Sequence, residues 1–124
     1  CGTGRHLRAL ARLPGLKIHG IDRNPADVAK AVRALREMPD ALSREVSVTS
    51  ADITQMPFAD ETFDCVICSE VLEHIPEHEA ALKELVRVLK PRGTLVRARR
   101  RAPRAVHEVH EVDEVGWPVA GTPA

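Results

Sequence analysis

Hydrophobic positions along the chain follow helical spacing in some segments and strand spacing in others. Leucine and alanine recur on one helical face near the start, short valine and isoleucine runs come next, and a second helical stripe marks the later half. Proline and glycine turns separate these segments. The pattern predicts helices over residues 5–13, 25–38 and 77–90, and strands over residues 16–21, 45–49, 63–68 and 94–96.

Strands and helices therefore alternate along the chain, which predicts an α/β fold with a parallel sheet flanked by helices on both faces. Asn24 and Pro25 suit the N-cap and the first turn of the second helix. The run over 63–68 is apolar almost throughout, as is typical of a strand buried on both faces. Residues 52–62 are expected to form a loop.

The pattern changes after Val96. Residues 97–104 hold five arginines, and valines then recur every third residue over 105–115 among His, Glu and Asp. A period of three fits neither a strand nor a straight helical stripe. We therefore expect an atypical, disordered tail over 97–124, either native or the product of a changed reading frame. A nucleic-acid patch or localisation signal is the alternative, disfavoured because aromatic residues are not interleaved.

Composition narrows the classes of partner. The 18 basic and 18 acidic residues give a formal net charge of zero, and aromatic residues are only 2% of the chain. No nucleic-acid partner and no membrane partner are expected, because base-stacking side chains are scarce and no apolar run approaches the roughly 20 residues of a membrane span. Three cysteines without a signal peptide suit free thiols in the cytoplasm. The oligomeric state stays open.

The chain opens on a glycine turn, Gly2 and Gly4, ahead of the first predicted helix. Such a turn lets the backbone approach a ligand, and the helix start favours anionic groups, although two glycines also suit an ordinary turn. A dinucleotide fingerprint needs a third glycine where Leu7 stands. Asp22 follows the glycine turn at nearly the spacing at which an acidic residue binds the ribose hydroxyls in that fingerprint. The alternative is that Asp22 is an ordinary solvated residue that opens a turn. Since nothing precedes the turn, we expect the natural N-terminus to be missing.

Several ordered motifs resemble those of class I S-adenosylmethionine-dependent methyltransferases. They fall across residues 1–96 in the family's order: Cys1-Gly2-Thr3-Gly4-Arg5-His6-Leu7, Gly20-Ile21-Asp22, Ala51-Asp52-Ile53, Met56-Pro57-Phe58, Phe63-Asp64, Val71-Leu72-Glu73-His74-Ile75, and Arg87-Val88-Leu89-Lys90-Pro91 with Gly93. The resemblance implies a Rossmann-like sheet that lacks the first strand and the C-terminal strands. It also implies a partial cofactor-binding domain over 1–96.

The same resemblance implies a site for S-adenosyl-L-methionine. The glycine turn would flank the methionine part, Asp22 would bind the ribose, and Asp52 with Ile53 would hold the adenine. The cofactor-binding residues implied are Cys1, Gly2, Thr3, Gly4, Asp22, Arg23, Asp52, Ile53, Ser69 and Glu70, the last two near the sulfonium. Carboxylates accept hydrogen bonds from ribose hydroxyls and exocyclic amines, which fits these roles. Asp52 could alternatively cap the loop that follows it.

Methyl transfer is an in-line displacement that depends on positioning, so no catalytic residue is obligatory. If the acceptor must lose a proton, His74 beside Glu73 is the candidate base; the alternative is a packing role. No metal is expected. Cys65 and Cys68 are three apart, which places them on opposite faces of a regular strand, as small buried hydrophobes. His74 and His78 are separated by Pro76, which argues against one continuous helix.

The sequence thus predicts a methyltransferase domain acting on an unidentified acceptor, a small molecule. Without the family's first strand, this chain alone is expected to bind the cofactor weakly. Two alternatives remain: a non-catalytic, truncated Rossmann-like binding module, and an NAD(P)-dependent oxidoreductase fragment, which Leu7 disfavours.

Overall fold

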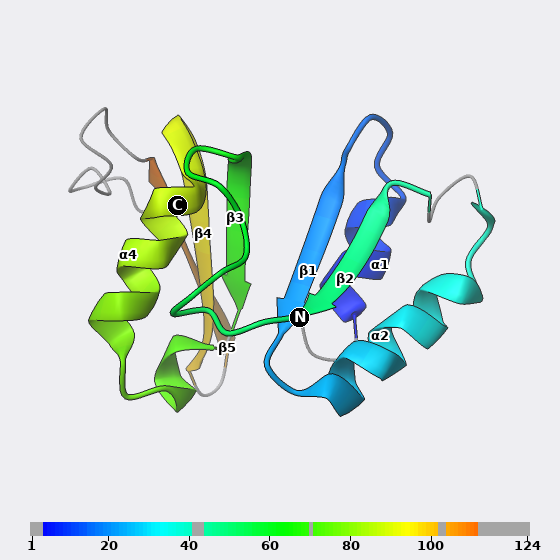
Figure 1. Ribbon diagram of the computed structural model, residues 1–124, viewed down its shortest axis with the longest axis horizontal. Helices are drawn as coiled ribbons and strands as arrows, with labels where there is room; N and C mark the ends of the chain where they lie inside the picture. Colours follow the sequence, from blue (N-terminus) through cyan, green and yellow to red (C-terminus); the bar gives the residue numbers. More distant parts are fainter. Residues whose placement is uncertain (1–3, 41–43, 70, 102–103, 112–124) are drawn as a thin grey trace. The chain divides into compact units, whose positions relative to one another are not determined.

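A computed structural model describes residues 4–40, 44–69, 71–101 and 104–111 of the chain. Figure 1 shows helices and strands alternating along it. The elements are α1 (Arg5–Ala11), β1 (Ile18–Asp22), α2 (Pro25–Arg36), β2 (Val46–Ser50), β3 (Phe63–Ser69), the short 3-10 helix η1 (Leu72–His74), α4 (His78–Val88), β4 (Leu89–Arg101) and β5 (Arg104–Glu111).

The chain forms two compact units, Cys1–Ile53 and Thr54–Ala124. In the first, β1 and β2 pair in parallel, from Ile18 opposite Val46 to Asp22 opposite Ser50. In the second, β3 pairs in parallel with β4, which pairs antiparallel with β5. The predicted α/β class with parallel strand pairs is confirmed.

Close packing between α1 and β1 organises the first unit. Leu7 of α1 is only 5% exposed. Gly20 of β1 lies beneath it, since a Cβ at position 20 would stand 2.7 Å from Leu7 Cδ1. Gly4 lies similarly against α2, with its hypothetical Cβ 3.2 Å from that of Ala31. Glycines at these two positions let a strand and a turn approach the helices closely.

The second helix begins as the sequence predicts. Asn24 is its N-cap, with the side chain accepting a hydrogen bond from the Ala26 amide, and Pro25 is its first residue. Ala31 and Leu35 are buried along its inner face. The helix ends at Arg36, two residues before the predicted end.

The core of the second unit lies between α4 and the strands. Ala81, Leu85 and Val88 are the buried residues of α4, and Leu95 of β4 is fully buried beside them. The helical spacing predicts a helix that runs to residue 90, but α4 ends at Val88 because Leu89 is already extended and pairs with β3. Proline at position 91 disfavours helical geometry in the residue before it.

The C-terminal region differs from the expected disordered tail. Residues 97–101 continue β4, and residues 104–111 return as β5, with Val96 opposite Val109 and Arg97 opposite Glu108. Strand pairing is made by backbone groups, so a side-chain period of three does not prevent it. Residues 112–124 lie outside the described part of the chain.

The third strand is less buried than its composition suggested. Cys65 is exposed and Ile67 is 42% exposed, whereas Cys68 is buried. One face of β3 therefore packs on the core, and the expectation of burial on both faces is wrong. Among the described residues, no helix is long and apolar enough to cross a bilayer.

Candidate functional site

The two acidic residues of the predicted nucleoside site come from adjacent strand ends in the first unit. Asp22 ends β1 opposite Ser50, the last residue of β2. The Ala51 amide donates a hydrogen bond to the Asp22 carbonyl oxygen at 3.0 Å, so the chain leaving β2 stays tied to the end of β1. Asp52 follows directly. The half-buried Asp22 and the exposed Asp52 therefore leave from one edge of the sheet.

The glycine turn is described from Gly4 onward; Cys1, Gly2 and Thr3 lie outside the described residues. Gly4 is buried and adopts φ 87°, ψ 17°, the left-handed region that favours glycine. Its carbonyl accepts from the Arg8 amide at 2.9 Å and so opens α1. The turn therefore has a conformation and a close contact with α2 that a larger residue would disturb.

Asp22 is also tied to the start of α2. The Asn24 amide donates to Asp22 Oδ1 at 2.8 Å, and Asn24 Oδ1 accepts from the Ala26 amide at 3.0 Å. Arg23, between them, is exposed, while Ile21 and Ile53 are half-buried. These two hydrogen bonds join the end of β1, the turn that follows it and the start of α2.

The remaining predicted residues belong to the second unit. Ser69 is the last residue of β3, and Glu70 lies outside the described residues. His74 is the exposed last residue of η1, where its amide donates to the Val71 carbonyl at 3.1 Å. His78 begins the separate helix α4, so His74 and His78 do not share one helix, as Pro76 predicts.

The cysteine pair is arranged as the spacing predicts, with one correction. Cys68 is buried and Cys65 is exposed, so the two lie on opposite faces of β3. The expectation that both are buried is wrong for Cys65. Partial burial of the Cys65 sulfur, reinforced by the Asp64 carboxylate, raises the pKa of the Cys65 thiol. Within the described ranges no three His, Cys, Asp or Glu side chains gather as a metal site would require.

A hydrogen-bonded histidine on β1 was not singled out from the sequence. His19 Nδ1 lies 2.8 Å from Ser47 Oγ, and Nε2 lies 3.0 Å from Thr49 Oγ1, both on β2. Partial burial lowers the pKa of His19. A neutral imidazole can donate through one nitrogen and accept through the other, which matches two hydroxyl partners.

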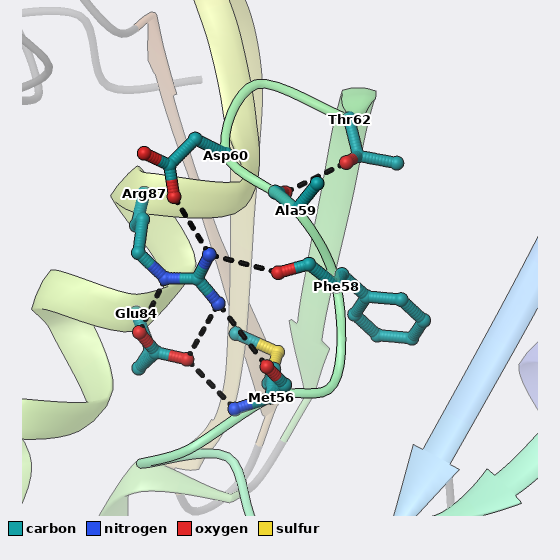
Figure 2. Close-up of polar contacts among 7 residues, drawn as sticks. All are labelled: Met56, Phe58, Ala59, Asp60, Thr62, Glu84 and Arg87. Atoms are coloured by element: carbon teal, nitrogen blue, oxygen red, sulfur yellow. Dashed lines mark hydrogen bonds and ion pairs between the residues drawn. The ribbon is translucent and has the colours of Figure 1, made fainter.

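The second unit contains a polar clamp, formed by Arg87 and Glu84 of α4, that holds the loop before β3 (Figure 2). Arg87 binds both carboxylate oxygens of Glu84 through Nε and Nη2. It also donates to the carbonyl oxygens of Phe58 at 2.8 Å and Met56 at 3.1 Å, and to Asp60 Oδ1 at 2.8 Å. Glu84 Oε2 accepts from the Met56 amide at 2.7 Å. The loop is thus fixed through its backbone.

The clamp is strongly charge-assisted. Hydrogen bonding from Arg87 lowers the pKa of Glu84 against the opposing effect of burial, and Glu84 in turn raises the pKa of Arg87. The Glu84 side chain is 17% exposed and the Arg87 side chain 31% exposed, so water does not fully screen the attraction between their charges. Sequence reasoning noted Arg87 only within a motif. The three-residue spacing of Glu84 and Arg87 on one helix was the available signal.

Known proteins similar to this chain are methyltransferases or share their fold. Sterol 24-C-methyltransferase erg6 from Aspergillus fumigatus is 33% identical over 93 residues, which are 75% of this chain and 24% of that protein. Methyltransferase GfsG from Streptomyces halstedii is 34% identical over 97 residues, covering 77% and 34% of the two chains. The chain therefore spans about a quarter to a third of the length of these curated relatives.

Solved structures include proteins with the same fold. The [4+2]-cyclase SpnF superposes with a TM-score of 0.74 at 33% identity, over 82% of this chain and 38% of its own. Phosphoethanolamine N-methyltransferase 2 from Haemonchus contortus, solved with S-adenosyl-L-methionine, gives 0.70 at 26% identity, over 79% and 22%. The sequence model of the family described as "Methyltransferase domain" matches residues 1–97. With most of its length matched, this chain belongs to that family, the class I methyltransferases that use S-adenosylmethionine.

Proposed function

We propose that the first unit of this chain binds S-adenosylmethionine and that the domain transfers its methyl group to a small-molecule acceptor in the cytoplasm. The supporting observation is the pair of acidic residues, Asp22 and Asp52, on adjacent strand ends tied together by the Ala51–Asp22 hydrogen bond. One carboxylate accepts from the ribose hydroxyls and the other from the adenine amine.

The glycine turn supports the same assignment. Gly4 sits in the left-handed region against Ala31, at the start of α1, in the same unit as both aspartates. In this proposal the turn from Cys1 to Gly4 receives the methionine part, Arg23 lies beside the ribose, and Ile53 packs on the base. Ser69 and Glu70, from the second unit, are assigned near the sulfonium by the family resemblance alone.

The test is a titration of the 124-residue chain with S-adenosylhomocysteine, followed residue by residue through amide chemical shifts, which detect weak binding. Shifts are expected at Gly4, Asp22 and Ile53. Asp22→Asn or Asp52→Asn should weaken binding about tenfold or more, because a hydrogen bond to a charged group is lost. Absence of any saturable shift at millimolar ligand would remove the proposal.

Asp27→Asn is the matched control. Asp27 is an acidic residue of the same unit, in the first turn of α2, where it forms a weak pair with Lys30 at 4.0 Å. Its replacement removes the same charge without touching either strand end, so affinity should stay within about twofold. If Asp27→Asn weakened binding as much as Asp22→Asn, the effect of both would be general electrostatics and the ribose assignment would fail.

Methyl transfer itself needs a separate measurement, because the similar protein SpnF is described as a cyclase. Transfer of labelled methyl from S-adenosylmethionine to a panel of small acceptors tests the activity. For acceptors that must lose a proton, we assign His74 as general base, so His74→Gln should lower turnover and leave cofactor affinity unchanged. Cofactor binding without transfer to any acceptor would favour the non-catalytic binding module.

A further inference from the structure

We propose that Asn24 is the positioning residue for the Asp22 carboxylate and thereby sets ribose affinity from the start of α2. The inference rests on the proposed function, because it takes Asp22 as the ribose acceptor. Asn24 itself is not assigned to contact the ligand. Its role follows from two hydrogen bonds, one made by its backbone and one by its side chain.

The backbone bond fixes the carboxylate. The Asn24 amide donates to Asp22 Oδ1 at 2.8 Å, two residues back along the chain. An ionised carboxylate accepts in the plane of its two oxygens, and a donor held on one oxygen fixes the rotation of that plane. Asp22 therefore has one preferred orientation at the end of β1.

The side-chain bond fixes the amide. Asn24 Oδ1 accepts from the Ala26 amide at 3.0 Å, which holds Asn24 in an extended conformation, φ −86° and ψ 111°. Pro25 favours the same conformation in the residue before it. Ala31 and Leu35 are buried on the inner face of α2 and hold the helix in place. The start of the helix therefore keeps the Asn24 amide in position beside Asp22.

A carboxylate that must accept from two vicinal hydroxyls depends on orientation as well as charge, since misplacement of one oxygen loses one of the two bonds. The hydrogen bond from the Asn24 amide restricts the rotation of the Asp22 carboxylate. Removing the cap should therefore weaken ligands that carry ribose hydroxyls and spare ligands that lack them.

The experiment compares adenosine with 2′,3′-dideoxyadenosine, titrated into the 124-residue chain by amide chemical shifts. Asn24→Ala should weaken adenosine binding about fivefold, which corresponds to the usual loss of a helix cap. The dideoxy compound should bind the two proteins equally. Asn24→Ser retains a capping oxygen and should restore adenosine affinity to within about twofold.

Arg33→Gly controls for simple weakening of α2. Arg33 is exposed on the same helix, and glycine there destabilises the helix by an amount similar to the lost cap. Adenosine affinity should be unchanged in this variant. An equal loss in Arg33→Gly and Asn24→Ala would overturn the positioning role, because helix stability alone would then explain it.

Asp22→Ala separates this inference from the proposed function. In that background Asn24→Ala should have no further effect on adenosine. If the wild-type chain binds neither adenosine nor S-adenosylhomocysteine, the proposed function fails and the inference fails with it. If the wild type binds and Asp22→Ala weakens adenosine, yet Asn24→Ala leaves it unchanged, only the inference is overturned.

Discussion

Leu7 fills the space above Gly20 so closely that a Cβ on residue 20 would lie 2.7 Å from Leu7 Cδ1 and 3.3 Å from Leu7 Cγ. In a dinucleotide fingerprint, close helix–strand packing is provided by a third glycine on the helix. In this chain the glycine is on the strand, and a leucine occupies the helix position. The close approach is retained while the turn departs from the dinucleotide pattern.

Gly20→Ala should therefore destabilise the first unit by about 1–3 kcal/mol, the usual range for overpacking a close contact. The measurement is urea unfolding followed by the far-ultraviolet signal. Leu7→Ala creates a cavity on its own, but in the double variant the two costs should partly cancel.

Gly15→Ala is the control for Gly20→Ala. Gly15, unlike Gly20, has a positive φ of 77°, and a Cβ there would meet nothing within 4 Å. Its cost should be backbone strain of roughly 1 kcal/mol and should add to that of Leu7→Ala. Strict additivity for Gly20→Ala as well would show that Leu7 and Gly20 do not interact.

Arg87→Lys should destabilise the second unit by about 1–3 kcal/mol. A lysine ammonium cannot bind Glu84 through two nitrogens and also reach the Phe58 and Met56 carbonyls, so polar groups of the loop lose their partners. Unfolding free energy is the readout. Lys83→Ala, which removes an exposed pair with Glu79 at 3.4 Å on the same helix, should change stability by less than about 0.5 kcal/mol.

Acid should weaken the clamp through Glu84. Its pKa is lowered in the folded state, chiefly by the hydrogen bond from Arg87, so the unfolded chain binds the proton more readily. The stabilisation is complete above the ordinary value of 4.5 and is lost as pH falls through the lower folded value. Glu84→Gln should flatten this part of the stability profile, and an unchanged profile would contradict the assignment.

His19 should give a second pH dependence, at higher pH and in the first unit. Burial lowers its pKa from 6.5, so the folded state disfavours the imidazolium. Its stability contribution is fully present above 6.5 and declines as pH falls below that value. Backbone amide exchange of β1 and β2 measures it. His19→Gln should abolish the slope, whereas the same change at the exposed His78 should retain it.

The parts of the fold that the sequence predicted well have strong local determinants. The start of α2 is specified by Asn24 and Pro25, whose capping and fixed φ act within a few residues. The end of β1 at Asp22 could be placed because the apolar residues Leu16, Ile18 and Ile21 stop there and a polar turn follows. These signals do not depend on distant contacts.

Other features depend on contacts that sequence spacing does not report. Leu89 has the helical spacing of α4, yet it joins β4 because Phe63 lies opposite it. Residues 97–101 and 104–111 pair through the backbone, which their side-chain period does not record. The clamp between Arg87 and the Met56 and Phe58 carbonyls joins positions about thirty residues apart and was likewise outside local reasoning.

Because Arg87 donates to main-chain carbonyl oxygens, a change of side chain at residue 56 or 58 does not by itself remove these hydrogen bonds (Figure 2). Glu84 and Arg87 cannot be replaced in the same way, since their own side chains make the hydrogen bonds of the clamp. Saturation mutagenesis of this region should therefore find Glu84 and Arg87 intolerant of change, and should accept mainly apolar replacements at the buried Met56 and at Phe58, whose ring packs against Phe63.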